Sequence, residues 1–377
     1  MYNFTKIHKE LKESVKKYIK DNIESKSNGE KINDKEFQDI LKGVAHVGYF
    51  GMVVPEKYNG SEMDLVSSTL VINELAKVNA SLAHIVSSAN YTFCYPLLKF
   101  GTEEQKKKYL TKCVTGEKLG VLSCTEPQIE TKTIFSGKGD KIILNGVKSF
   151  VTSGKIADYA LVQATNSFEG MEFNRLTFLI VDLKAKGVTI SKEQEPMGLK
   201  QIGLVEISFK DVELNKDNVL GEINQGGQVL MDIFNLMKLG DSSIALGLAE
   251  RAYKEALEYM KIRKADNNAL INMQSVQFDL AEMKTKLSLM RLLTYTVCEN
   301  IEKQDANISE DTSMLKLYNT TEAKKICDAC LQMFGGFGYI KGNIIEKIFR
   351  DVRAMSITGG HLAGMKSMIA FNLNYED

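Results

Sequence analysis

Several features that direct a chain to nucleic acid, to a membrane or out of the cell are missing from this sequence. Its 48 Lys and Arg residues equal its 48 Asp and Glu residues, so it lacks the basic excess of a protein that binds phosphate backbones. No apolar run reaches the length of a membrane span. Charges occur throughout residues 1–22, which excludes the apolar core of a secretory signal. We therefore expect a cytoplasmic protein without a nucleic-acid or membrane partner.

Cysteine is also too scattered to hold the fold together. The six residues form no disulfide framework, as is usual for a protein of a reducing compartment. One close pair, Cys327 and Cys330, lies in helical sequence, and no second pair of Cys or His stands at metal-binding spacing. We interpret the pair as small core residues and expect no metal site.

The hydrophobic pattern changes twice along the 377 residues, which are too many for one simple core. Residues 1–117 carry apolar side chains at helical spacing, such as Leu70 and Leu75. Residues 118–224 contain short runs rich in Val, Ile, Thr and Phe, typical of a β-sandwich or barrel. Residues 225–377 return to long helical repeats, which predict a bundle.

Local signals add detail to this division into three domains. Asn145-Gly146 lies between two strand-like runs and predicts a tight hairpin turn. Two polar stretches, 265–272 and 305–312, are predicted to separate the long helices of the third domain. An order of helices, strands and helices again is uncommon and narrows the fold.

Several motifs then occur in a specific order. They include LSCTEP at 122–127, SFVTSG at 149–154, a Gly-rich segment at 332–339 and RDVRAMSITGG at 350–360. Each motif alone is loose, but together they resemble the acyl-CoA dehydrogenase family over nearly the whole chain. The resemblance implies an α+β multidomain fold with an N-terminal all-α domain, a central β domain and a C-terminal four-helix bundle. It also implies FAD as the cofactor.

The resemblance places the flavin ring against the β domain. Backbone N–H groups and hydroxyls of two strands are implied to hydrogen-bond the ring, because flavin reduction builds negative charge that such donors stabilise. The family's Ala-Gly-Ser-Asp loop is replaced at 129–132, where a Thr keeps the hydroxyl and a Lys reverses the charge. The residues implied to line the flavin are Ser123, Cys124, Thr125, Thr131, Phe150 and Thr152.

A second set of FAD contacts is implied to come from a partner copy of the chain. An Arg in the family's Tyr-x-x-x-Arg motif is implied to bind the pyrophosphate, since a guanidinium donates two parallel hydrogen bonds. A Gln-x-x-Gly-Gly segment is implied to contact the adenosine half, because Gly allows close backbone approach. These residues are Arg263, Gln274, Gln332, Gly335 and Gly336. We therefore expect a homo-oligomer, either a dimer or a tetramer.

The carboxylate that the family uses as its catalytic base is missing from both of its usual positions. Most members carry a Glu where this chain has Gly359, and a second group carries it where this chain has Met237. In that second group an Arg follows, and Lys238 takes its place here. The resemblance implies that Lys238 and Gly359 lie beside the substrate.

Two nearby residues are candidates to replace the missing glutamate. Asp241 lies one helical turn beyond Met237 and shares its face, so we expect it to act as the base and to contact the substrate. His361 lies two residues beyond Gly359 and can titrate near neutrality. The resemblance also allows His361 to contact the flavin.

The resemblance implies an FAD-dependent oxidoreductase that acts on the CH–CH bond of an acyl thioester. The thioester is carried by CoA or by an acyl or peptidyl carrier protein, and an electron-transfer flavoprotein is a possible electron partner. The missing glutamate leaves other chemistries open. Four alternatives to dehydrogenation are open if no residue replaces the glutamate. They are a reductase of an enoyl thioester, a redox-neutral enzyme, a flavin-dependent monooxygenase, and a flavin-binding homologue without catalysis.

Overall fold

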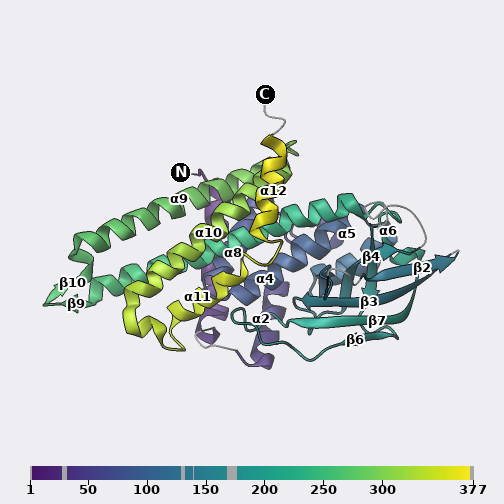
Figure 1. Cartoon of the computed structure of the whole chain (residues 1–377), viewed down its shortest axis with the longest axis horizontal. Helices are drawn as coiled ribbons and strands as arrows, with labels where there is room; N and C mark the ends of the chain where they lie inside the picture. Colours follow the sequence, from purple (N-terminus) through teal and green to yellow (C-terminus); the bar gives the residue numbers. More distant parts are fainter. Residues whose placement is uncertain (1, 28–31, 129–131, 139, 168–175, 374–377) are drawn as a thin grey trace.

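The computed structural model describes residues 2–27, 32–128, 132–138, 140–167 and 176–373. Helices form the first and last parts of the chain, and a sheet lies between them in sequence (Figure 1). The predicted α+β fold of three parts is therefore confirmed. The predicted divisions at 117/118 and 224/225 fall in the connections between the last short helix and the first strand, and between the last strand of the sheet and the longest helix.

The N-terminal helices are capped by the polar residues that precede them. Asn33, Asp64 and Asn79 each accept a hydrogen bond from a backbone N–H of the first turn, which satisfies a donor that the helix itself leaves unpaired. Asp64 begins a helix whose residues are all buried. The elements are α1 (Lys6–Asn22), α2 (Asp34–His46), α3 (Leu65–Ala76), α4 (Ala80–Ser88), η3 (Ala89–Cys94), α5 (Tyr95–Phe100), α6 (Glu103–Gln105) and α7 (Thr111–Val114).

The sheet of the central part has the strand order β6-β7-β3-β2-β4-β5-β8, and β1 also pairs with β4. Its pairs are antiparallel except for β1 with β4 and β2 with β4. Alternate side chains pack into a core of their own, with Leu144, Val162 and Val205 fully buried. The strands are β1 (Gly120–Ser123), β2 (Ile134–Lys138), β3 (Lys141–Val151), β4 (Tyr159–Asn166), β5 (Leu176–Asp182), β6 (Val188–Ile190), β7 (Val205–Asn215) and β8 (Val219–Leu220).

The turn predicted at Asn145-Gly146 is wrong, because β3 runs through both residues without reversing. The register of β3 against β7 shifts between Leu144 and Gly146, so Asn145-Gly146 lies at a β-bulge. A Cβ on Gly146 would lie 2.5 Å from the Cα of Thr133. The glycine is therefore explained by the close approach of the neighbouring chain segment rather than by a hairpin.

The C-terminal bundle is built around the longest helix, α8 (Gly226–Ile262). With 37 residues it is about 55 Å long at the usual rise per residue. One of its ends lies at the sheet, and the small β9–β10 hairpin lies at the opposite end of the bundle (Figure 1). The further elements are β9 (Lys264–Ala265), β10 (Asn268–Ala269), α9 (Gln274–Glu302), α10 (Ile308–Phe334), η8 (Gly335–Tyr339), α11 (Ile344–Ala354) and α12 (Leu362–Asn372).

The predicted breaks in the bundle are found, with small adjustments. The hairpin and a short 3-10 turn occupy residues 264–272 between α8 and α9, one residue earlier than the predicted break begins. The break predicted at 305–312 is shorter, because α10 already begins at Ile308. Glu310 and Asp311 stand in its first turn, where acidic residues favour a helix N-terminus.

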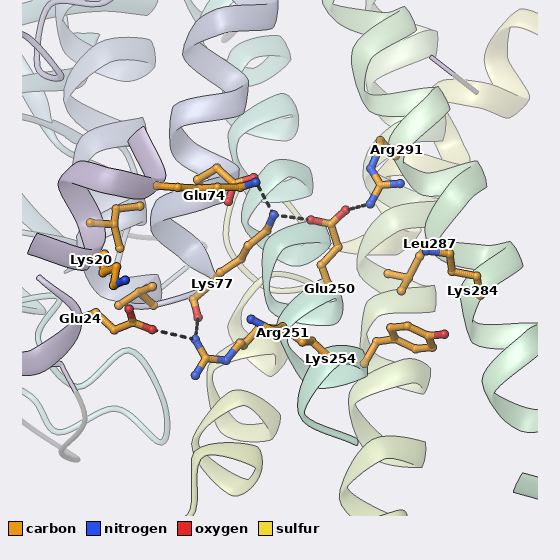
Figure 2. A pocket seen from close by; sticks show the side chains of 14 residues that line it. Lys20, Glu24, Glu74, Lys77, Glu250, Arg251, Lys254, Lys284, Leu287 and Arg291 are labelled. Atoms are coloured by element: carbon orange, nitrogen blue, oxygen red, sulfur yellow. Dashed lines mark hydrogen bonds and ion pairs between the residues drawn. The ribbon is translucent and has the colours of Figure 1, made fainter. Parts of the chain in front are cut away.

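A partly buried ion network joins the N-terminal helices to the bundle (Figure 2). Lys77 lies 2.8 Å from the Glu250 carboxylate of α8 and 2.7 Å from Glu74 of α3. Arg291 of α9 donates to the other oxygen of Glu250. The network lines a cavity of about 510 Å³ between α1, α3, α8 and α9. One carboxylate therefore joins the C-terminal end of α3 to α8 and α9.

None of the helices in the described ranges is long and apolar enough to cross a membrane. Within the same ranges, no group of three His, Cys, Asp or Glu side chains is arranged to hold a metal ion. The six cysteines are free thiols, and Cys327 and Cys330 are both buried in α10.

Candidate functional site

The turn that carries Gly359 is fixed at the junction of the bundle and the β domain. Asp351 of α11 accepts a hydrogen bond from the backbone N–H of Leu199 at 2.6 Å. Its neighbour Arg350 donates to the carbonyl of Met197 at 2.8 Å. Both contacts join the end of α11 to the loop between β6 and β7. The residues that follow α11 therefore start from a defined point.

A close helix crossing brings a second part of the site into place. Gly240 of α8 faces α4, and a Cβ at this position would lie 2.1 Å from the Oγ of Ser87. The glycine therefore lets α4 approach α8 at the level of the next residue, Asp241. This approach places His84 of α4 beside Asp241, with its Nε2 4.0 Å from Oδ1.

Asp241 lies at the centre of a buried polar cluster. Its Oδ2 accepts a hydrogen bond from Lys316 of α10 at 2.5 Å and another from the Thr358 hydroxyl at 3.1 Å. Lys316 also donates to the Thr358 carbonyl. Asp241 is 5 % exposed and Lys316 is fully buried. Three elements that are distant in sequence therefore meet at one carboxylate.

Gly359 leaves the space that this carboxylate fills. A Cβ on Gly359 would lie 2.5 Å from Oδ2 of Asp241 and 3.1 Å from Nζ of Lys316. The residue also has φ +63, a conformation that disfavours any side chain. The Asp241 carboxylate of α8 thus lies directly beside Gly359. The sequence resemblance places the glutamate of most family members at this position.

Lys238 is a second buried lysine near this cluster. Its Nζ donates to Ser313 Oγ at 3.0 Å and lies 3.4 Å from Asn235 Oδ1. Burial, helped by the charge of Lys316, lowers the pKa of Lys238 from 10.5 to about 8. One carboxylate and two lysines give this part of the site an excess of positive charge, which suits a substrate that develops negative charge at its carbonyl.

Replacing Lys238 by Met is expected to stabilise the fold below pH 8. Because the folded-state pKa lies below the ordinary value, the unfolded chain binds more protons between about pH 8 and 10.5 and stability rises with pH there. The cost of holding the charge amounts to at most about 3 kcal/mol. Chemical denaturation at several pH values measures this difference. An advantage of Lys238→Met that stays constant up to pH 10.5 contradicts the expectation.

The other two positions considered for the base lie differently. Met237 is half-buried and packs against an apolar cluster shared by α5, α8 and the sheet. His361 is exposed and caps α12, with its Nδ1 accepting from the Gly364 N–H at 2.9 Å. Nδ1 of His361 is therefore occupied by the helix-capping hydrogen bond. The roles of His361 as a base and as a flavin contact stay predictions.

The two segments expected to line the flavin lie side by side. The N–H of Ser149 donates to the carbonyl of Thr125 at 2.9 Å. The buried Lys148 donates to the carbonyl of Cys124 at 3.0 Å and to Glu126 at 2.5 Å. Strand β3 and the segment after β1 are thus joined where both sequence motifs occur.

Two features of these segments fit a ligand that lies against them. Phe150 is 60 % exposed and has φ +54 in an irregular part of β3, a costly conformation for an aromatic residue. The Oγ atoms of the buried Ser123 and Ser153 have no hydrogen-bond partner among the described residues. Thr152 follows β3 in a turn and is half-buried. Thr131 lies outside the described residues.

The remaining predicted FAD residues lie elsewhere. Arg263 ends α8 beside the hairpin, at the far end of the bundle from the sheet (Figure 1). Gln274 begins α9, and Gln332 lies near the end of α10; both are exposed. A Cβ on Gly335 or Gly336 would meet no atom within 4 Å. Because α8 is roughly 55 Å long, Arg263 is remote from the β domain of its own chain.

Comparison with known proteins agrees with this fold. The family models of the acyl-CoA dehydrogenase N-terminal, middle and C-terminal domains match residues 5–117, 124–212 and 224–373. A 3-(aryl)acrylate reductase from Clostridium sporogenes is 33% identical, with 98% of this chain and 99% of the relative covered. The chain belongs to the acyl-CoA dehydrogenase family. Members of this family are flavoenzymes, and the chain is an oxidoreductase acting on the CH–CH bond of an acyl thioester.

Two further relatives are informative. The caffeyl-CoA reductase-Etf complex subunit CarC from Acetobacterium woodii is 34% identical, and 86% of each chain is covered. The structure of butyryl-CoA dehydrogenase from Megasphaera elsdenii superposes with a TM-score of 0.94 at 28% identity, covering 99% of this chain and 100% of that one. The chain is therefore similar in sequence to relatives named as reductases, and it shares its whole fold with a dehydrogenase.

The structure brings Asp241 and Gly359 together, as well as two residues that the sequence did not indicate for this site. Lys316 had no sequence signal, because it is 75 residues from Asp241 along the chain. His84 stands among apolar residues, which favours a core or surface role. The sequence hints at the position of His84 through the small residues in 87–90 and at Gly240. The reason for these small residues becomes clear from the close crossing of α4 and α8.

Proposed function

We propose that this chain binds FAD and reduces an α,β-unsaturated acyl thioester, with Asp241 in place of the family's missing glutamate. The observation that carries the proposal is the contact between Asp241 and the vacant side-chain position of Gly359. Asp241 thus supplies a carboxyl group at a place where this chain lacks the glutamate of its family. The names of two relatives, a 3-(aryl)acrylate reductase and a caffeyl-CoA reductase subunit, support the reductive direction.

The residues of the β domain fit an isoalloxazine ring. Phe150 presents an exposed aromatic face, and the unpartnered hydroxyls of Ser123 and Ser153 remain to be paired. Thr125 and Thr152 supply further hydroxyls beside them. When bound, FAD supplies the two-electron exchange with the β-carbon of the thioester.

Asp241 is proposed to handle the proton at the α-carbon. In reduction its carboxyl group donates a proton to this carbon, and in oxidation its carboxylate removes one. Lys316 and Thr358 bind Oδ2 and so fix the orientation of the group. Lys238 and Lys316 add positive charge near the thioester carbonyl, where negative charge develops during the proton transfer.

The proposed substrate is an enoyl thioester, tested first with 3-aryl-acrylyl and crotonyl thioesters of CoA and of a carrier protein. The holoenzyme is photoreduced without oxygen and mixed with each thioester. Rapid reoxidation of the flavin with formation of the saturated thioester supports the proposal. If no thioester reoxidises the flavin, but O₂ admitted afterwards does so with formation of an oxygenated product, the result supports a monooxygenase. A bound flavin that no thioester reoxidises supports a homologue without this catalysis.

Arg263 is proposed to bind the FAD pyrophosphate of a partner copy, which makes the active enzyme at least a dimer. Arg263→Ala is expected to weaken FAD binding roughly 10- to 100-fold, since a hydrogen bond to a charged group contributes about 1.5–3 kcal/mol. Fluorescence titration of the apoprotein measures the affinity. Lys264→Ala removes a neighbouring positive charge from the same hairpin and is expected to leave the affinity unchanged.

Mixed oligomers test whether Arg263 acts between subunits. A chain carrying Arg263→Ala is coexpressed with a chain carrying Asp241→Asn. If each arginine serves its partner's site, one site in the mixed dimer has both intact residues, and activity returns. Mixed oligomers that are as inactive as the single variants place Arg263 in the site of its own chain. An electron-transfer flavoprotein is proposed as the electron donor, as the name of the CarC complex suggests.

A further inference from the structure

The two oxygens of Asp241 are used differently. Oδ2 accepts from Lys316 and Thr358 and faces Gly359. Oδ1 receives no hydrogen bond from any residue in the described part of the chain. The titratable group that faces it is His84, whose Nε2 lies 4.0 Å away. Oδ1 is thus the oxygen left for proton transfer, and His84 is in position to exchange a proton with it.

His84 has a polar atom that packing alone does not explain. The residue is 8 % exposed, and its Nδ1 is buried without a partner among the described residues. Such an atom destabilises a fold, and an apolar side chain on α4 would avoid the loss. Its retention in a closely packed helix crossing is explained if the ring has a role in the cluster.

Burial and two neighbouring charges act on the pKa of His84. Burial is the largest cause and lowers the pKa of His84, as does the positive charge of Lys316 on α10. The negative charge of Asp241 on α8, the helix packed against α4, acts in the opposite direction and raises it. The negative charge of Asp241 therefore acts directly on the pKa of the ring.

We propose that His84 acts through Asp241, by exchanging a proton between its Nε2 and Oδ1. The inference rests on the proposed function and extends it to a second titratable group. In reduction, the O–H bond of Asp241 breaks as the new C–H bond forms at the α-carbon. The Nε2–H bond of protonated His84 then breaks as a new Oδ1–H bond forms. A hydronium ion from solvent restores the proton on His84, and no electrons move in these last two steps.

A small side-chain rotation is sufficient for this exchange. The 4.0 Å separation exceeds hydrogen-bond length by roughly 1 Å. Lys316 and Thr358 hold Oδ2, so a rotation of the imidazole ring, rather than of the carboxylate, brings the two atoms together. His84 is thus a positioning residue that acts through Asp241.

The first test compares pH profiles of the holoenzyme and of His84→Gln. We expect His84→Gln to lower kcat roughly 10²-fold at acid pH, the lower end of the contribution of a positioned proton-transfer group, with KM nearly unchanged. In the wild type, we expect kcat to fall as pH rises through the titration midpoint of His84. In His84→Gln this fall is expected to disappear. His46→Gln makes the same chemical change at an exposed site and is expected to keep the wild-type profile.

The second test does not require turnover. The chain has four histidines, so ¹⁵N labelling of histidine gives few signals, and single variants assign them. In Asp241→Asn, where the opposite charge is lost, the titration midpoint of His84 is expected to fall, while that of His46 stays unchanged. His84→Asn serves as a second variant if His84→Gln loses FAD or its far-ultraviolet circular dichroism changes.

The outcomes separate the two proposals. A profile of His84→Gln that superimposes on that of the wild type, or a His84 midpoint that is unaffected by Asp241→Asn, overturns the role of His84. If no thioester reoxidises the wild-type flavin, the proposed function fails. The labelled titration then still decides whether His84 and Asp241 are coupled.

Discussion

Asp241→Asn is expected to lower the rate of thioester reduction by roughly 10²–10⁴-fold, the contribution of a general acid or base, while FAD remains bound. An amide fills the same space beside Gly359, but it neither donates nor accepts the α-proton. Stopped-flow reoxidation of the photoreduced flavin by an enoyl thioester measures the effect in a single turnover. Asp279→Asn makes the same change at an exposed position of α9 and is expected to leave the rate unchanged.

A paired substitution makes this prediction sharper. Gly359→Glu alone places a Cβ 2.5 Å from the Asp241 carboxylate and adds backbone strain of about 1–2 kcal/mol, so we expect a less stable and less active enzyme. Asp241→Ala with Gly359→Glu removes the collision and restores one carboxylate. The double variant is expected to be at least roughly tenfold faster than Asp241→Ala, a non-additive result typical of residues in contact. If it is no faster, the Asp241 carboxylate is not the missing group.

Glu250→Gln is expected to destabilise the fold by at most about 3–5 kcal/mol, because it leaves the partly buried charges of Lys77 and Arg291 beside a neutral group. Burial alone would raise the pKa of Glu250, but Lys77 and Arg291 lower it from 4.5 to about 2. The stabilisation it provides is therefore complete above pH 4.5 and is lost as pH falls toward 2. Denaturant unfolding of the two proteins between pH 3 and 7 measures the difference.

A surface carboxylate of the same helix provides the control for this measurement. Glu258 pairs with Lys261 at 2.7 Å, but its side chain is 60% exposed, and such pairs contribute at most about 1 kcal/mol. Glu258→Gln is therefore expected to have a small effect at every pH. A Glu250→Gln protein that is as stable as Glu258→Gln would show that the network in Figure 2 does not hold the N-terminal helices to the bundle.

Local sequence patterns were sufficient for the parts of the molecule that depend on periodicity. They predicted the helical, strand-rich and helical regions, and the one-turn spacing that placed Asp241 on the face of Met237. They failed at Asn145-Gly146, because the close approach of Thr133 to Gly146 is a tertiary contact that a turn dipeptide does not reveal. Lys316 and His84 were missed for a related reason. Each reaches Asp241 through a helix crossing that no short segment of sequence describes.

The contact between Gly359 and Asp241 limits how this enzyme arises from its relatives. A side chain at 359 and the carboxylate of Asp241 compete for the same space, so the two carboxylates are alternatives that exclude each other. A lineage moving from one to the other passes through an intermediate with two colliding acids or with none. Sorting homologues as active or inactive by the residue in the turn alone therefore misplaces chains of this kind, and position 241 has to be considered together with it.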